Sequence, residues 1–277
     1  MANYKHKLIN TEFGTLVLPR LEDISKWEMG QPDVRAESAT QLFPIGSTLI
    51  TDDGVYRYAR CGADSVSIGK LLQQAAVGNA AQIRNVAVEA DAAIGATSVT
   101  ITTPTGDLTA DYLKDGYLFV NDATGEGAVY KIKSHPAASA ATSCVITLVD
   151  PLEVALVAET SKVGLRKNLY DAVIVNPITP TGIPIGVVNH SSFTATYYAW
   201  IKTKGIVAVL TNGTIIVGRM VAPGVTITGS VDTYPITLVE GTPNTYVPGD
   251  TPCVGVVMSV GATTEYSLVK IDLDPSW

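Results

Sequence analysis

Few side chains of this sequence stand in an arrangement that could perform acid–base or nucleophilic chemistry. The chain has three histidines, and His190 is the one followed by potential nucleophiles, Ser191 and Ser192. A serine nucleophile needs a histidine base that a carboxylate orients. Neighbouring residues of a strand point to opposite faces, and no nucleophile-elbow pattern surrounds this triplet. We therefore predict that the protein is not an enzyme and has no catalytic residue.

Acidic turn sequences are the other candidates for chemistry. The segment 121–126 (NDATGE) offers oxygen ligands but lacks the alternating acidic positions of a calcium loop, and Asp52-Asp53-Gly54 has the composition of a tight turn. A glycosidase would need two facing carboxylates, for instance Asp150 and Glu153, and the sequence does not show whether any pair faces a cleft. No phosphate-binding glycine motif is present. We predict no bound metal and no cofactor.

Charge and cysteine content exclude further classes of protein. The chain of 277 residues carries 19 Lys and Arg against 26 Asp and Glu, a net charge of −7, without a long basic run. Binding of nucleic acid is therefore not expected. Its three cysteines are far apart, which predicts reduced, buried thiols. No apolar run approaches the roughly 18 residues of a membrane span and no signal-peptide pattern opens the chain, so we expect neither membrane insertion nor secretion.

The elements that must position any site are predicted to be mainly β-strands. Residues 205–221 show the pattern most clearly, because two runs rich in valine and isoleucine meet at Asn212-Gly213, a dipeptide typical of hairpin turns. A second hairpin is predicted over 46–64, with Tyr56 and Tyr58 on one face. One short helix is predicted over 66–77, after the N-cap Ser65.

Four regions follow from the pattern along the chain. Residues 1–45 are predicted to form an extended arm, whose isolated apolar residues, including Phe13, Leu16, Leu18 and Trp27, must pack on the protein's own body or on a neighbour. Residues 46–90 hold the hairpin and the helix. Residues 91–165 are predicted to form a β module with strands near 97–102, 116–122, 128–133 and 144–149, and residues 166–277 a β-sandwich or barrel.

Two aromatic residues in the last region could serve a binding function. Tyr198 and Trp200 are two residues apart and share one face of a predicted strand, so they could stack on a sugar. Large aromatic side chains are more commonly buried, and we favour core packing for this pair.

Several segments resemble virion structural proteins of tailed bacteriophages. They are residues 56–63 (YRYARCGA), 111–121 (DYLKDGYLFVN), 125–132 (GEGAVYKI), 149–152 (VDPL) and 197–205 (YYAWIKTKG). The C-terminal part, with Gly186-Val187-Val188 and Gly255-Val256-Val257, is similar to small β-barrel cement proteins of capsids.

The resemblance implies a decoration or cement protein that binds the outer surface of the head as a homotrimer and stabilises the lattice of the major capsid protein. Its place would be the virion exterior, after synthesis in the host cytoplasm. Phe13, Leu16, Leu18 and Trp27 of the arm would then contact the capsid or a neighbouring subunit. The alternative is a tail-fibre or baseplate adhesin that binds host-surface glycan, in which case Tyr198 and Trp200 should be exposed together.

Overall fold

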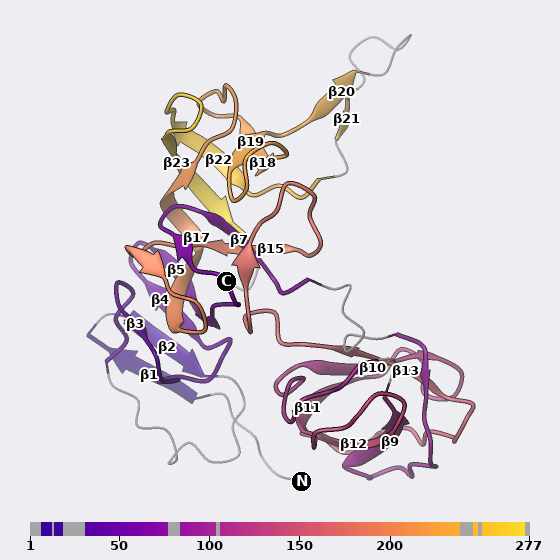
Figure 1. Cartoon of the computed structure of the whole chain (residues 1–277). Helices are drawn as coiled ribbons and strands as arrows, with labels where there is room; N and C mark the ends of the chain where they lie inside the picture. Colours follow the sequence, from indigo (N-terminus) through magenta and orange to yellow (C-terminus); the bar gives the residue numbers. More distant parts are fainter. Residues whose placement is uncertain are drawn as a thin grey trace. The chain divides into compact units, whose positions relative to one another are not determined.

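The computed structural model describes residues 7–12, 14–18, 31–76, 84–103, 106–238, 246–248 and 251–274, and this part of the chain is all-β (Figure 1). Within it, no helix could cross a membrane. The predicted mainly β class is confirmed. The chain divides into two compact units, Met1–Ala75 with Tyr170–Trp277 and Ala76–Leu169. The first unit thus combines two stretches of sequence, between which the second is inserted.

The first unit is built on a large antiparallel sheet, whose main path is β1-β2-β4-β5-β17-β23-β22-β18-β19. Strand β17 is central because it pairs with β5 along one edge and with β23 along the other. The strands on this path are β1 (Lys7–Thr11), β2 (Gly14–Leu18), β4 (Thr48–Thr51), β5 (Gly54–Arg60), β17 (Tyr198–Leu210), β18 (Met220–Pro223), β19 (Val231–Thr233), β22 (Gly255–Ser259) and β23 (Tyr266–Asp272).

Short strands complete this unit. They are β3 (Glu37–Ser38), β6 (Val66–Ser67), β7 (Leu71–Gln73), β14 (Ile174–Val175), β15 (Pro184–Val187), β16 (Ser192–Phe193), β20 (Ile236–Leu238) and β21 (Tyr246–Pro248). Strands β3, β7, β14 and β15 attach to the large sheet, while β6 pairs with β16 and β20 with β21. The hairpin predicted over 46–64 is confirmed as β4–β5, in which Thr51 stands opposite Gly54.

The predicted helix over 66–77 is wrong. Strand β6 pairs with β16, and β7 pairs with both β14 and β15. Leu71, Leu72 and Gln73 are all buried, so this segment lacks the solvent-facing side that an amphipathic helix would have. Gly69 has a φ of 70°, which interrupts any helix there. Pairing with strands far along the chain has overridden the local helical spacing.

The hairpin predicted at Asn212-Gly213 is also wrong. Strand β17 runs through Gly205 and ends at Leu210, and the next strand, β18, pairs with β19 and β22 rather than with β17. Asn212 bonds to β19 instead of closing a hairpin turn. Its backbone N–H donates to the Val231 carbonyl at 2.8 Å, and its side-chain amide donates to Asp232 at 3.1 Å. The chain therefore passes to a different part of the sheet.

An aromatic cluster forms one core of the first unit. The ring of Phe43 lies 5.2 Å from those of both Tyr58 and Trp200, and the latter two are 5.1 Å apart. The backbone N–H of Leu42 donates to the Tyr58 hydroxyl at 3.1 Å, so the buried oxygen has a partner. Burial raises the pKa of Tyr58 to about 12.

The second unit is a nearly closed six-stranded sheet. The strand order is β8-β13-β10-β11-β12-β9, and an isolated bridge between Val88 and Ile101 links the residue after β8 to β9. The four strands predicted in this region are confirmed as β9 to β12. The strands are β8 (Val86–Ala87), β9 (Ser98–Thr102), β10 (Tyr117–Asp122), β11 (Val129–Ser134), β12 (Ser143–Leu148) and β13 (Lys162–Arg166).

His135 of the second unit is buried. Its Nε2 accepts a hydrogen bond from the Leu113 backbone N–H at 2.9 Å. The proton must therefore reside on Nδ1, which lies 2.8 Å from the Pro136 carbonyl and donates to it. Both ring nitrogens are satisfied by backbone, so this histidine ties a loop to a strand end.

Candidate functional site

Within the described part of the chain, nothing covers one face of the large sheet where β17, β23 and β22 run side by side. In these strands, alternate residues such as Val209, Val257 and Val269 are buried in the core, and the residues between them point outward. Six large outward side chains of β17, β18, β22 and β23 are apolar or aromatic, and each is between 38% and 47% exposed. We call this set the outer face; it comprises Ile206, Met220, Val256, Met258, Tyr266 and Leu268.

Strand register assembles the outer face from segments distant in sequence. Lys270 of β23 stands opposite Ile206 of β17 and opposite Val256 of β22. Val256 in turn stands opposite Met220 of β18. One continuous row therefore crosses four strands, with a single cation among three apolar side chains.

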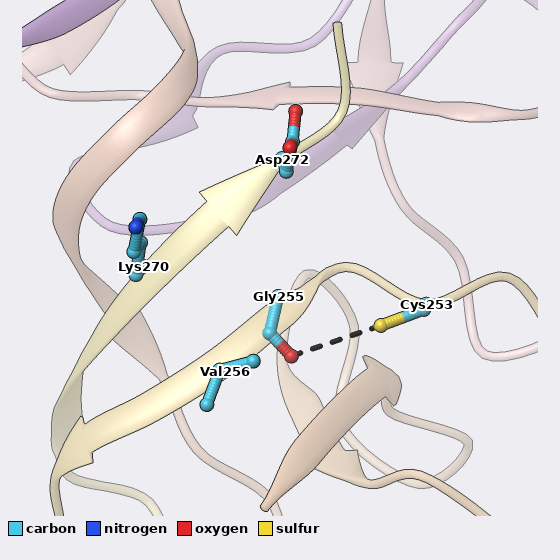
Figure 2. A pocket seen from close by; sticks show the side chains of 5 residues that line it. All are labelled: Cys253, Gly255, Val256, Lys270 and Asp272. Atoms are coloured by element: carbon cyan, nitrogen blue, oxygen red, sulfur yellow. Dashed lines mark hydrogen bonds between the residues drawn. The ribbon is translucent and has the colours of Figure 1, made fainter. Parts of the chain in front are cut away.

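A cavity of about 430 Å³ opens at this row and is lined by Cys253, Gly255, Val256, Lys270 and Asp272 (Figure 2). The Cys253 thiol donates to the Gly255 carbonyl at 3.8 Å. A Cβ on Gly255 would lie 2.3 Å from the Lys270 carbonyl oxygen, so β22 can approach β23 here because this residue has no side chain. Asp272 lies 3.4 Å from the Nζ of Lys204 on β17, which places an ion pair beside the cavity.

The groups around the cavity suit binding better than catalysis. Its lining holds one thiol, one amine and one carboxylate, without a histidine base or a second carboxylate. Among the described residues, no three His, Cys, Asp or Glu side chains are grouped so that they could hold a metal ion. An apolar depression with one charge of each sign can accept a side chain of a partner protein.

An ion pair between a buried lysine and an exposed aspartate lies near the β4–β5 turn. The side chain of Lys202 is 4% exposed, and its Nζ donates to Asp53 at 2.9 Å. The hydroxyls of Thr51 and Tyr56 donate to the same carboxylate. Burial acts to raise the pKa of Asp53, but these hydrogen bonds and the charge of Lys202 hold it below its usual value. Every polar atom of this group has a partner, which is the arrangement of a structural ion pair.

His190 does not form a catalytic group with the serines that follow it. The ring is 2% exposed, stands edge-on to Phe193 at 5.5 Å, and neither ring nitrogen has a hydrogen-bond partner. Burial lowers the pKa of His190; the charge of Glu37 raises it and that of Arg35 lowers it further. The ring is therefore neutral near pH 7. A catalytic base would need a bonded nucleophile and an orienting acid. This histidine is a core residue.

Two of the four arm residues predicted to contact a capsid or a neighbouring subunit are buried in the protein's own core. Leu16 and Leu18 are 2% and 0% exposed, in the same core cluster as Phe43 and Trp200. They belong to the β1–β2 hairpin, which joins the sheet by pairing β2 with β4. A contact with a neighbour through these two leucines would require the hairpin to leave its own sheet. Phe13 and Trp27 lie outside the described residues.

The aromatic pair considered for glycan binding is not exposed together. Trp200 is 2% exposed and packs against Phe43 and Tyr58, while Tyr198 is half-buried and stacks on Tyr58 at 6.1 Å. Trp200 therefore offers no ring face to a sugar. Packing in the core, which the sequence favoured, accounts for both side chains.

The remaining candidates have structural partners or positions of their own. The side-chain amide of Asn121 donates to Asn85 at 3.1 Å, and Asp122 accepts from the Ala123 N–H in its loop. Cys61 and Cys144 are buried as predicted, whereas Cys253 is exposed, contrary to the prediction. Of the two carboxylates considered for a glycosidase, Glu153 is exposed and Asp150 half-buried.

Sequence reasoning missed the outer face. Strand β22 lies in the region predicted to form a sandwich or barrel, and its alternating residues are largely apolar on both faces, as Val256, Val257 and Met258 show. The apolar character of both faces was the available signal, because an ordinary half-buried strand would carry polar residues on one side.

No family model, no curated protein and no solved structure matches this chain.

Proposed function

We propose that the protein is a virion structural protein that decorates a capsid, binding the major capsid protein through the outer face without catalysis. The observation that supports this proposal is the row across β17, β23, β22 and β18, in which the exposed apolar side chains of Ile206, Val256 and Met220 surround one cation, Lys270. The resemblance of several segments to tailed-phage virion proteins supplies the identity of the partner.

The size of the outer face suits a protein contact. Six large side chains exposed to this degree present roughly 500 Å² of mostly apolar surface, about the size of the largest apolar patch on a typical monomer, which is often functional. A stable interface buries about 800 Å² on each partner, with an apolar centre and a polar rim. The outer face would supply the centre, and the charges of Lys204, Lys270 and Asp272 beside it would form part of the rim.

A homotrimer would strengthen attachment, because three modest contacts made at once increase the effective affinity. The sheet suits this mechanical role, since antiparallel strands are linked along their length by backbone hydrogen bonds. β17 alone pairs over most of its 13 residues with β5 and β23.

The test combines light scattering with sedimentation. The molar mass of the purified protein is first measured in solution by light scattering. A trimer supports the proposed homotrimer and a monomer refutes it. The protein is then mixed with undecorated capsids, and the fraction that co-sediments is measured. The variant Val256→Lys places a second cation in the centre of the outer face and should weaken binding at least ten-fold. Ile94→Lys, at a 70% exposed position of the second unit, is the matched control.

Circular dichroism and thermal melting establish that both variants fold. If folded Val256→Lys co-sediments as well as the natural protein, the outer face is not the capsid contact. If the natural protein fails to co-sediment, the decoration function itself is wrong.

A further inference from the structure

The second unit carries a binding surface of different character on the outside of β13, β10 and β11. Tyr117 in β10 is 44% exposed and points away from the core, because its neighbour Leu118 is buried. Strand register places Arg166 of β13 directly opposite Tyr117 on one side and Lys131 of β11 directly opposite on the other. The exposed phenol ring therefore stands between two cations.

A second ring extends this surface along the same strand. Phe119 points to the same side as Tyr117 and stands opposite Gly164. A Cβ on Gly164 would lie 2.3 Å from the Cζ of Phe119, so the ring occupies the space above the glycine backbone. Side chains two residues apart on a strand are about 6.6 Å apart along the strand axis. The surface thus offers two neighbouring aromatic rings.

Acceptors as well as donors surround the two rings. Asp115 lies 3.9 Å from the Nζ of Lys131, and this carboxylate retains 31% of its side-chain exposure. Arg166 carries a planar guanidinium, the group that pairs best with carboxylates, and its Nη1 donates to the Leu165 carbonyl at 3.4 Å. A ligand that fits must combine a flat apolar face, hydroxyl groups and at least one negative charge.

We propose that this surface, composed of Tyr117, Phe119, Lys131 and Arg166, binds an acidic saccharide. The C–H face of a sugar ring stacks on Tyr117 or Phe119, and its carboxylate is held between Arg166 and Lys131. Asp115 accepts hydrogen bonds from sugar hydroxyls. This inference is independent of the capsid contact, because it concerns another unit and other residues.

Charge favours a saccharide over a nucleic acid. A single strand brings one phosphate per nucleotide, which the net charge of −7 of the whole chain opposes. A saccharide with isolated carboxylates needs only the local cations. Asp115 repels any anion beside it, so a strand with one phosphate per nucleotide meets more repulsion than a saccharide with isolated carboxylates.

The structural alternative is that Phe119 only covers Gly164. Such cross-strand pairs of an aromatic residue and a glycine stabilise sheets without binding anything. That role requires neither the exposed ring of Tyr117 nor the two cations that flank it. Substitution of Tyr117 and Arg166 therefore separates the two explanations.

The test measures binding by titration calorimetry with two acidic probes and their neutral counterparts. These are oligogalacturonate against its methyl ester, and sialyllactose against lactose. The full-length protein should bind at least one acidic probe, and at least ten-fold more tightly than its counterpart, because a charge-assisted hydrogen bond is lost in the neutral compound. Affinity should fall as salt is raised.

Variants identify the residues. Tyr117→Ala and Arg166→Gln should each weaken binding about ten-fold or more, since they remove the stacking ring and the paired donors. Val145→Thr, at a 43% exposed position on β12, is the control and should bind normally. Thermal melting establishes that each variant is folded.

Three outcomes would overturn the proposal. They are the absence of binding to both acidic probes at millimolar concentration, equal binding of acidic and neutral counterparts, and tighter binding of a thymidine oligonucleotide than of either acidic probe. Unchanged affinity in folded Tyr117→Ala would equally exclude this surface as the site.

Discussion

The buried ammonium of Lys202 allows a sharp test of how the first unit is held together. Asp53→Asn keeps the shape of the side chain but removes its charge, so that Lys202 stays charged and 4% exposed beside a neutral partner. Two unit charges 2.9 Å apart attract by about 6 kcal/mol at an effective dielectric constant of about 20. The carboxylate is 56% exposed and water screens it, so we expect a loss of about 2 kcal/mol in the free energy of unfolding.

The assay is urea unfolding followed by tryptophan fluorescence. All three tryptophans belong to the sequence of the first unit, so the signal reports this unit. Lys202→Met removes the ammonium with little change in volume, and the double variant with Asp53→Asn should recover most of the lost stability. Asp52→Asn, at the exposed neighbouring position, is the control and should change the free energy of unfolding by less than about 0.5 kcal/mol.

A pH series extends the test. The folded-state pKa of Asp53 lies below the reference value of 3.8, so its contribution is present above pH 3.8 and is lost as the pH falls below that value. Asp53→Asn should remove this part of the acid dependence. The reasoning is refuted if Asp53→Asn unfolds at the same urea concentration as the natural protein, or if the double variant is no more stable than Asp53→Asn.

Three further predictions concern other parts of the chain. The folded-state pKa of His190 lies below 6.5, so below that pH the unfolded state binds more protons than the folded state. The free energy of unfolding therefore falls as the pH drops from 6.5 towards the folded-state pKa, by about 1.4 kcal/mol for each pH unit. His190→Phe should flatten this dependence in urea titrations. Gly205→Ala should cost about 2 kcal/mol or more, because φ is 115° and a Cβ would lie 2.4 Å from a backbone oxygen. A thiol reagent should label Cys253 in the native protein but Cys61 only after unfolding, since burial raises the pKa of the latter to about 11.

Each of these predictions has its own control and contradicting result. An unchanged pH profile in His190→Phe would assign the acid sensitivity to other groups. Gly218→Ala, where φ is 81° and no atom lies within 4 Å of the added Cβ, should cost less than Gly205→Ala; equal costs would exclude the steric explanation. Rapid labelling of Cys61 in the native state would show that its core opens readily.

Local pattern was a good guide wherever a strand pairs with its neighbour in sequence. The β4–β5 hairpin and the consecutive strands β10, β11 and β12 were predicted because composition and turn residues act over short distances. The pattern misled over 66–77, where helical spacing was present, because β7 is buried between β14 and β15 from a distant part of the chain. It misled again at Asn212-Gly213, whose turn is directed by contacts with Val231 and Asp232.

Both binding surfaces proposed here depend on register between separate strands. Tyr117 stands between Arg166 and Lys131 only because β10 lies between β13 and β11. Ile206, Val256 and Met220 likewise come together only across four paired strands, so local pattern does not show which residues share either surface.

The sequence by itself determined the mainly β class, the low charge density and the composition of the tight turns, because these follow from the conformational preferences of single residues and their nearest neighbours. The tertiary structure decided which alternate residues of each strand face the core. It buried Leu16, Leu18 and Trp200 and left Val256, Leu268 and Tyr117 exposed. That choice belongs to the pairing of distant strands, since a strand's two faces become different only when a second layer covers one of them.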